Sequence, residues 1–462
     1  MVKRQLAERA LMKALSTGGD FAELFFEDRL NNSITLQGGK VEIVNTGRLH
    51  GVGVRLFKGI RSVYSYTNDF DEAGLLACAG EAASALKESV KADAPDIRLT
   101  GSIAVNLHPV SKLPGDIGGA WRVDRLRSAD AAMKAVSNEI TQTICRYVDW
   151  DQRVTIANSE GLFTSDRRVY TRVALSAVAS DGAENQSGMS GPGAMRGAEF
   201  AESLDIEERA RKAASMAVTM LRARQSPAGV MPVVIDGGFG GVIFHEACGH
   251  SLEATSVARG LSEFAGKVGQ KIAADIVTAV DDGTMPGEWG SINIDDEGTP
   301  SNRLVLIENG VLKNYMVDKL NARRMGGVPV TGSSRREGYT YAPTSRMRNT
   351  YIAAGTDDED EMIRSMGDGL YAKTMGGGSV NPTTGEFNFA VMEGYLVRDG
   401  KVAEPVRGAS LIGRGSEILL KIDRVGRDMT MAQGMCGSVS GSVPTNVGQP
   451  MIRVSSLTVG GR

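Results

Sequence analysis

The run HEACGHSLEA, which spans residues 245–254, constrains the chain more than any other stretch. Two of the chain's four histidines, His245 and His250, stand five positions apart, and Glu246 directly follows the first. In the familiar zinc-binding pattern His-Glu-x-x-His the histidines stand four apart, so both lie on one face of a helix. At about 100° per residue, the extra residue here rotates His250 to about 140° from His245. A regular helix therefore cannot bring both rings to one ion.

A local distortion of the helix would remove this difficulty. A π-bulge absorbs one extra residue, and such bulges favour functional sites. We expect the distortion at Gly249, because glycine tolerates unusual backbone angles. A glutamate in an apolar helix is costly unless it is paired or catalytic. The run is therefore interpreted as a metal site rather than as a helix that carries two ordinary core histidines.

The spacing of residues in the sequence does not by itself identify the third metal ligand. A catalytic zinc normally takes three protein ligands and one water. Cys248 follows His245 by three residues but would point away from His250 on a regular helix. Glu253 would lie between the two histidines, where it could ligate the metal or hold a histidine by a hydrogen bond. Cys436 is remote, in a Gly-Met-Cys-Gly segment whose glycines, Gly437 among them, would permit close backbone approach.

Composition excludes several classes of protein. The chain has 462 residues, of which 57 are glycine without a Gly-X-Y period, and 42% are hydrophobic, so collagen and wholesale disorder are excluded. The net charge of −3 and the lack of a basic cluster argue against nucleic-acid binding. No apolar stretch reaches the roughly 18 residues of a membrane span, and the charged start lacks a signal-peptide core. Four scattered cysteines do not form a disulfide pattern, so we expect a soluble cytoplasmic protein.

Periodicity predicts an α+β fold with mixed or antiparallel sheets in two halves, and the Ser-Pro-Ala-Gly punctuation at 226–229 divides them. We expect an N-terminal α+β domain over 1–228 and a strand-rich C-terminal domain over 229–462 that contains the metal helix. The predicted helices span 2–15, 72–88, 123–137, 201–224 and 241–254, with a loop over 95–119. The predicted strands span 33–37, 41–44, 51–57, 61–66, 154–156, 170–175, 232–235, 276–280, 303–307, 311–316, 387–389, 394–397 and 418–422.

Two glycine clusters have competing interpretations. Residues 237–241 follow a strand and precede a helix, but Ile243 stands where a dinucleotide fingerprint needs glycine and no Walker lysine follows. Nucleotide binding is therefore disfavoured, and these glycines are expected to let the helix start pack close to a sheet. Gly377 and Gly378 would either expose strand-edge backbone to an extended peptide or form a plain turn. Arg346 and Asn349 are further weak candidates for substrate contact, with ion pairing as the alternative.

The chain also resembles a known family, the TldD/PmbA metallopeptidases, and specifically the metal-bearing TldD type. The resemblance extends over nearly the whole chain and is strongest after residue 229. Its metal-free partner subunits lack the His-Glu-x-x-x-His run, which this chain has. The matching segments are residues 234–236, 245–254, 281–284, 295–300, 306–312, 346–351, 434–437, 447–450 and 457–461.

The resemblance implies a zinc ion held by His245, His250 and Cys436, with Glu246 as the general base for the zinc-bound water. It implies hydrolysis of short or unfolded peptides in an enclosed cavity, with the N-terminal domain serving dimerisation and the cavity. The dimer would be a homodimer or a heterodimer with a metal-free paralogue. One departure concerns the cysteine: many members follow it with Gly-Lys, where this chain has Gly437 and Ser438.

Two other classes of function compete with the peptidase. One is a non-catalytic, zinc-stabilised regulatory or assembly protein, in line with the family's older description as a modulator of DNA gyrase. The other is a nucleotide-dependent enzyme, which would be stabilised by nucleotide; we expect no such stabilisation.

Overall fold

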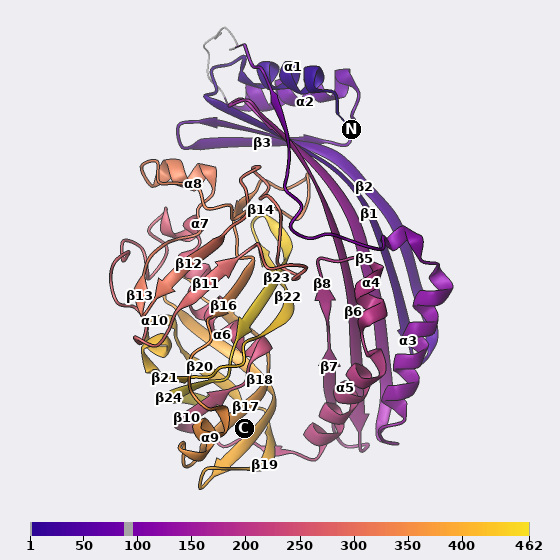
Figure 1. Ribbon diagram of the computed structural model, residues 1–462, viewed down its shortest axis with the longest axis vertical. Helices are drawn as coiled ribbons and strands as arrows, with labels where there is room; N and C mark the ends of the chain where they lie inside the picture. The colour runs from indigo at the N-terminus through magenta and orange to yellow at the C-terminus, as the bar shows by residue number, and fades with distance from the viewer. Residues whose placement is uncertain (1, 87–95, 462) are drawn as a thin grey trace.

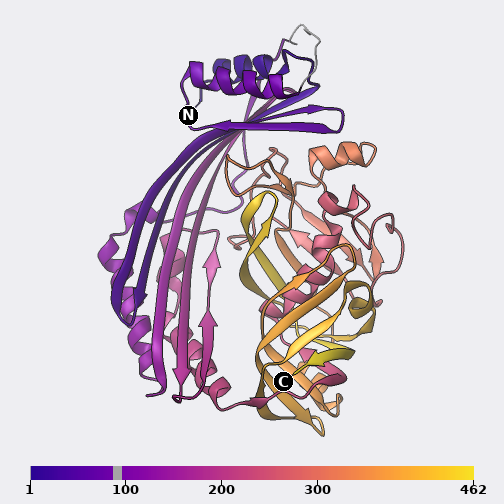
Figure 2. The ribbon, with the colours of Figure 1, turned by 180° about the vertical axis from the view of Figure 1, so that it is seen from behind.

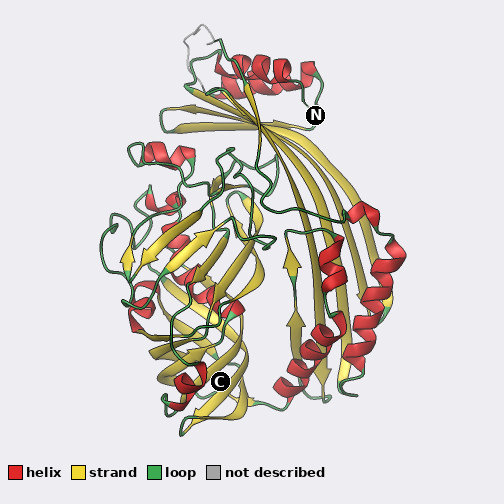
Figure 3. Ribbon diagram, in the orientation of Figure 1, coloured by secondary structure: helices red, strands yellow, loops and turns green. Residues whose placement is uncertain are grey.

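A curved N-terminal sheet stands beside a strand-rich C-terminal half in the computed structural model, which describes residues 2–86 and 96–461. The concave face of the sheet is turned toward the C-terminal half, and helix α3 covers the outer face (Figures 1 and 2). Strands dominate the C-terminal half, whereas the longer helices accompany the N-terminal sheet (Figure 3). The α+β class and the two halves are thus confirmed. The metal-site run, residues 245–254, lies in the C-terminal half as predicted.

The N-terminal sheet has the order β3-β2-β1-β5-β6-β4, with β7 and β8 also paired to β6. All its pairs are antiparallel except β4 with β6. Its strands are β1 (Phe21–Gln37), β2 (Lys40–Lys58), β3 (Arg61–Thr67), β4 (Thr100–Ile103), β5 (Ile140–Asn158), β6 (Leu162–Ser180), β7 (Asn185–Ser190) and β8 (Gly193–Ala194).

The strands predicted over 33–37 and 41–44 are the tip of one long hairpin, β1–β2. The alternation of apolar residues underestimates its length because β1 carries buried carboxylates. Glu23 and Glu27 are each 1% exposed and accept hydrogen bonds, Glu23 from Arg336 at 2.8 Å and Glu27 from the Tyr339 amide at 2.7 Å. These partners are contributed by the C-terminal half, which a local pattern cannot show.

The helices of this half are α1 (Arg4–Leu15), α2 (Glu72–Ala85), α3 (Gly119–Lys134), α4 (Ala198–Ser203) and α5 (Ile206–Leu221). The predicted helix over 72–88 is confirmed to residue 85; its residues 87 and 88 lie outside the described residues, as does residue 95 of the predicted loop. The predicted helix over 201–224 is wrong in one respect. It is two helices, because Asp205 caps α5 by accepting a hydrogen bond from Glu208 N at 2.9 Å.

The main sheet of the C-terminal half has the order β17-β10-β24-β20-β18-β19-β9, and a further β17–β18 pairing joins five of its strands into a closed ring. Strand β21 pairs with β24. An extensive buried apolar cluster includes side chains from the ring and from the metal-site run. The strands are β9 (Arg224–Gln225), β10 (Gly229–Ile235), β17 (Gly369–Val380), β18 (Glu386–Arg398), β19 (Lys401–Arg407), β20 (Ser410–Arg414), β21 (Ile422–Val425) and β24 (Ile452–Gly460).

A second sheet has the order β13-β12-β11-β16-β23-β22, and its edge is the hairpin β22–β23. Its strands are β11 (Ala279–Asp282), β12 (Arg303–Glu308), β13 (Val311–Leu312), β16 (Asn349–Ile352), β22 (Thr430–Ser438) and β23 (Gly441–Gln449), and β14 (Ser334–Arg335) pairs separately with β15 (Thr344–Ser345). Short helices fill the connections: α6 (Val242–Phe244), α7 (Ala254–Val257), α8 (Lys319–Arg324), α9 (Glu359–Arg364) and α10 (Gly415–Ile418).

Three strand predictions in this half need correction. Residues 418–421 are the end of α10 and a 3₁₀ turn, and β21 begins only at Ile422. The strand expected over 311–316 stops at Leu312, and the one expected over 276–280 is displaced to β11. Short apolar runs fit a helix turn as well as a strand, so periodicity alone does not separate them. Across the described residues, no helix is long and apolar enough to cross a membrane.

Candidate metal centre

The metal-site run enters along a glycine-rich turn that lies against the second sheet. A Cβ on Gly241 would lie 2.5 Å from the backbone nitrogen of Gly448 in β23, so only glycine fits there. A Cβ on Gly240 would meet the side chain of Gln449 at 2.8 Å. The expectation that these glycines allow close packing against a sheet is confirmed.

The run itself is not one regular helix. Residues Val242–Phe244 are α-helical, His245–Gly249 form a π-turn, and His250–Leu252 form a 3₁₀ turn. The amide of His250 donates to the carbonyl of His245, five residues earlier. This hydrogen bond turns the two histidines toward each other, as the extra residue in the motif requires. The predicted distortion is therefore confirmed, and the helix predicted over 241–254 ends at Leu252, because the backbone of Glu253 is extended.

The reason for Gly249 differs from the one expected. Its backbone angles, φ −54° and ψ −52°, are ordinary helical values, so no conformational freedom is needed. A Cβ at this position would instead overlap the sulfur of Met347, which is fully buried. Glycine is needed at this position because a larger residue has no room beside Met347. Gly437 was also expected to allow close approach, but a Cβ there would meet nothing within 4 Å.

Three donor atoms converge on one point. The Sγ of Cys436, on β22, lies 3.4 Å from Nε2 of His245 and 3.4 Å from Nε2 of His250. The ligand atoms of the three residues all lie within 4.8 Å of one another. Tetrahedral zinc with Zn–S of about 2.3 Å and Zn–N of about 2.05 Å separates sulfur from nitrogen by about 3.6 Å. The donor set and its spacing therefore fit a zinc ion.

The charges at this centre also favour a cation. Burial opposes ionisation of Cys436, but the charge of His245 and hydrogen bonds from both histidines outweigh it, and they lower the thiol pKa from 9.0 to about 3. Burial alone would lower the pKa of His250, whereas Glu253 and Cys436 raise it well above its ordinary value. A thiolate beside a carboxylate thus stabilises positive charge at this point.

Each histidine is held through its second nitrogen. His245 Nδ1 lies 3.3 Å from Thr350 Oγ1, and that hydroxyl in turn donates to the Asn446 carbonyl at 3.3 Å. His250 Nδ1 lies 3.1 Å from Glu253 Oε2. Partners of this kind fix ring orientation and leave Nε2 free for a metal. Thr350 was missed by the sequence analysis, because only the fold brings β16 beside the run.

Arg346 links the cysteine strand to the histidine run. It is fully buried and donates to Ser440 Oγ at 3.0 Å, to the Gly441 carbonyl at 2.9 Å and to the Cys436 carbonyl. Its Nε lies 3.8 Å from Glu253 Oε1. Every one of these partners is within the chain. The arrangement ties the cysteine strand to the end of the run and leaves the side chain of this arginine without exposed surface.

Glu246 lies beside the cluster and partly open to solvent. Its Oε2 is 3.7 Å from Nε2 of His250, and its side chain is 21% exposed. It shares a cavity of about 380 Å³ with the three donor residues. The remaining lining residues come from the end of the run, α7, the end of β17 with the loop after it, and β22: Glu253, Thr255, Ser256, Ser379, Val380, Pro382, Met435, Gly437 and Ser438. A carboxylate placed here can accept a proton from a water molecule close to the donor atoms.

The other candidate residues lie elsewhere. Cys248 is fully buried in the apolar cluster, and burial raises its thiol pKa well above the usual value. Asn349 is fully buried, where it donates to Ser291 Oγ at 2.8 Å and accepts from the Gly290 amide at 3.0 Å. Gly377 and Gly378 are exposed positions within β17, just before the lining residue Ser379. They are part of a strand, so the alternative of a plain turn is wrong.

Two nitrogen donors and one sulfur donor, with a carboxylate beside them, are typical of the active site of a metal-dependent hydrolase. Family models agree with this class: the PmbA/TldA metallopeptidase domain 1 matches residues 22–86, the central domain 112–221 and the C-terminal domain 228–461. The chain belongs to the PmbA/TldA metallopeptidase family. It is accordingly a metallopeptidase, as the sequence resemblance implied.

Individual relatives and structures agree with this assignment. A metalloprotease TldD homolog of Haemophilus influenzae is 36% identical over 460 residues, covering 96% of this chain and 93% of the relative. A zinc metalloprotease TldD homolog of Saccharolobus solfataricus is 31% identical over 246 residues, 53% of this chain and 54% of that protein.

Two solved structures share the fold. A candidate modulator of a DNA gyrase from Thermotoga maritima superposes with a TM-score of 0.80 at 22% identity, covering 99% of both chains. TldE from Thermococcus kodakarensis superposes with a TM-score of 0.79 at 17% identity, covering 99% of this chain and 100% of TldE.

Proposed function

We propose that the protein is a zinc-dependent peptidase whose metal is held by His245, His250 and Cys436. The observation that carries this proposal is the convergence of Cys436 Sγ with both histidine Nε2 atoms at 3.4 Å, although the cysteine lies 186 residues beyond His250. Two imidazoles and one thiolate form a ligand set that zinc accepts in catalytic sites, where a fourth position stays open.

Glu246 is proposed as the general base. When bound, zinc polarises a peptide carbonyl and lowers the pKa of a water molecule. Glu246 Oε2 would take the proton from the attacking water and pass it to the departing amine. The carboxylate has no hydrogen-bond partner among the described side chains that would compete with this role. Its position 3.7 Å from His250 Nε2 keeps it within reach of a water beside the three donors.

The proposed substrates are short or unfolded peptides. The metal cavity of about 380 Å³ accommodates an extended segment and excludes a folded domain. We further propose a dimer in the cytoplasm: a homodimer, or a heterodimer with a metal-free paralogue. The likeness to TldE supports a shared fold between such partners. The modulator description of the Thermotoga maritima neighbour supports a regulatory alternative only weakly, since 22% identity extends to the fold alone.

Zinc stoichiometry tests the ligand assignment. Cys436→Ala removes a donor from the cluster, whereas Cys248→Ala removes a buried sulfur outside it. We expect near-stoichiometric zinc in the wild type and in Cys248→Ala, and loss of zinc in Cys436→Ala. Loss in Cys248→Ala alone would refute the assignment.

Peptide cleavage by Glu246→Gln tests the mechanism. The variant should keep its zinc and lose cleavage by about two to four orders of magnitude. Glu308→Gln, an exposed residue on β12, serves as the matched control and should cleave normally. Unchanged cleavage by zinc-loaded Glu246→Gln contradicts the proposed base. A cellular role that persists without cleavage would favour the regulatory alternative.

A further inference from the structure

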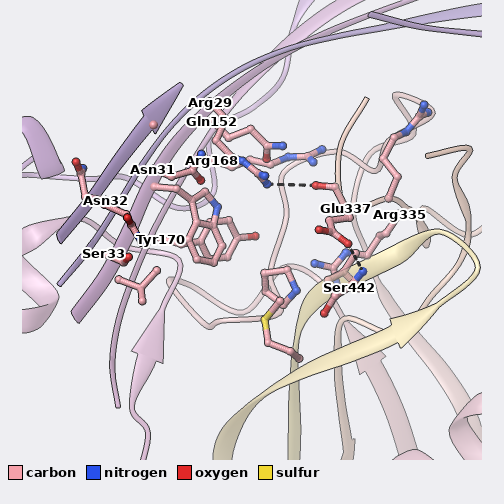
Figure 4. Close-up of a pocket in the computed structure, with 18 of the residues that line it drawn as sticks. Arg29, Asn31, Asn32, Ser33, Gln152, Arg168, Tyr170, Arg335, Glu337 and Ser442 are labelled. Atoms are coloured by element: carbon pink, nitrogen blue, oxygen red, sulfur yellow. Dashed lines mark hydrogen bonds between the residues drawn. The ribbon is translucent and has the colours of Figure 1, made fainter. Parts of the chain in front are cut away.

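A second cavity, of about 460 Å³, lies between the N-terminal sheet and the C-terminal half. Figure 4 shows Arg29, Asn31, Asn32 and Ser33 on one side of it, with Arg335, Glu337 and Ser442 facing them from the other side. Nothing in the peptidase mechanism described above uses these residues. The cavity therefore needs an explanation of its own.

Arg335, on β14, is the unusual group in this cavity. It is 4% exposed, and its one hydrogen bond among the described residues goes from Nη1 to the Met347 carbonyl at 2.8 Å. Within the described parts of the chain no carboxylate lies within ion-pair distance of it. A buried guanidinium without a counter-ion is costly, so an anion bound beside it would offset that cost.

The acidic groups that line the same cavity already have partners. Asp296 accepts from Arg168 Nη1 at 2.6 Å and from the Arg336 amide at 2.6 Å. Glu337 accepts from the Ser442 amide at 2.8 Å. The lining holds five arginines and these two carboxylates: Arg29, Arg146, Arg168, Arg335, Arg336, Asp296 and Glu337. An unmet positive charge thus remains on the side where Arg335 lies.

The metal cavity differs from the arginine-lined cavity in its basic side chains. Among its described lining residues there is no lysine or arginine. The two cavities are adjacent, because Met435 lines both. Met435 is 47% exposed on edge strand β22 and directly precedes the donor Cys436. A molecule that occupies the arginine-lined cavity can therefore extend past Met435 toward the metal centre.

We propose that Arg335 binds a carboxylate of the peptide substrate in the arginine-lined cavity and makes the enzyme selective for peptides that carry one. The inference rests on the proposed peptidase function. A carboxylate fits the planar fork of a guanidinium. The neighbouring walls suit the rest of a peptide: Trp150 stacks on Tyr170 at 4.8 Å between ring centroids, and amide side chains lie on β1. The carboxylate is contributed by the C-terminus or by an acidic side chain.

Matched peptides test this selectivity. One peptide sequence without acidic residues is prepared as the free acid and as the C-terminal amide, and a third version carries the amide and one glutamate. The wild type should cleave a carboxylate-bearing version with kcat/KM on the order of tenfold to a hundredfold above the neutral amide. Preference for the free acid identifies the terminus as the source, and preference for the glutamate version identifies a side chain.

Substitution of the arginine should abolish this difference. Arg335→Met should lower kcat/KM for the preferred peptide to the value for the amide and leave the amide unchanged, while Arg335→Lys keeps part of the preference. Arg48→Met removes an exposed arginine that pairs with Asp28 outside the cavity, and it should behave as the wild type. An equal loss on both peptides in Arg335→Met, or no preference in the wild type, overturns the proposal.

A binding measurement separates this inference from the proposed function. The same three peptides are titrated into Glu246→Gln, with tryptophan fluorescence as the readout because Trp150 lines the cavity. We expect a carboxylate-bearing version to bind more tightly than the neutral amide, and Arg335→Met in the same background to remove the difference. Selective binding without any cleavage by the wild type would leave the anion site standing and refute the peptidase. Cleavage without selectivity would refute the anion site and leave the peptidase proposal standing.

Discussion

Replacing Arg346 by methionine separates a positioning role from a substrate contact. The side chain is fully buried and holds the carbonyl of Cys436 and the β22–β23 turn, while its Nε lies 3.8 Å from Glu253. Methionine has a similar reach but no charge. The variant therefore leaves Glu253, which is 4% exposed, with His250 as its remaining nearby cation, and it leaves buried carbonyls without a donor.

The expected cost is large. Removing one partner of a buried ion pair destabilises proteins by about 3–5 kcal/mol. In a folding unit of 150–250 residues each kcal/mol lowers the melting temperature by about 2–4 °C, so we expect a fall of roughly 6–20 °C. Zinc affinity should fall about 10- to 100-fold, because both a histidine partner and the cysteine strand lose support. Glu253→Gln in the same background removes the carboxylate charge that Arg346 no longer balances and should restore part of the stability.

Calorimetry and zinc titration against a chelating dye measure both effects. Arg364→Met serves as the control, since that side chain is 61% exposed and paired with Glu361, and it should change stability by less than about 0.5 kcal/mol. A substrate contact would behave differently, with a raised KM at unchanged melting temperature and zinc affinity. That second pattern in Arg346→Met would refute the positioning role.

Three further outcomes are expected. Chelation should lower the melting temperature of the wild type, and added zinc should restore it. If free zinc is at 100 times its Kd, chelation removes about 2.7 kcal/mol of stabilisation. The melting temperature of Cys436→Ala should respond to neither treatment. Thr350→Val removes the partner of His245 Nδ1 and should weaken zinc binding about tenfold or more, as measured by competition with a dye. Burial, reinforced by the nearby Asp130 and only partly opposed by Lys134, raises the pKa of Cys145 from 9.0 to about 12. The unfolded chain therefore loses this proton first, and stability falls between pH 9 and 12 by up to about 1.4 kcal/mol per pH unit; melting curves of Cys145→Ala should show a shallower decline, and an identical slope would contradict the assignment.

The local chemistry of the centre could be predicted, because it depends on neighbours in the chain. The one-residue insertion between His245 and His250 requires a distorted turn, and the π-turn over His245–Gly249 provides it. The need for glycine at 249 could not be predicted locally, because it comes from Met347, which is almost a hundred residues away. Spacing also left the third donor open, and only the fold brings Cys436 to the histidines while it buries Cys248.

The parts that were missed depend on pairings between distant segments. Glu23 and Glu27 interrupt the apolar alternation of β1, so the length of the β1–β2 hairpin could not be inferred from periodicity. Arg335 and Arg346 look alike in sequence, both within a short basic stretch, yet one lines a cavity and the other is enclosed by backbone carbonyls. Burial of a charged residue follows from the fold and leaves no local signature.

The order of the strands has a consequence for when the enzyme becomes active. Strand β10, which precedes the histidines, obtains its neighbour β24 from the last residues of the second half, and the sulfur donor arrives only with β22. A ribosome makes the chain from the N-terminus, so a nascent copy holds both histidines long before Cys436 is translated. The proposed zinc site cannot be completed until the chain has been synthesised past Cys436. A nascent copy that ends before Cys436 holds two of the three proposed ligands and cannot yet act as the proposed peptidase.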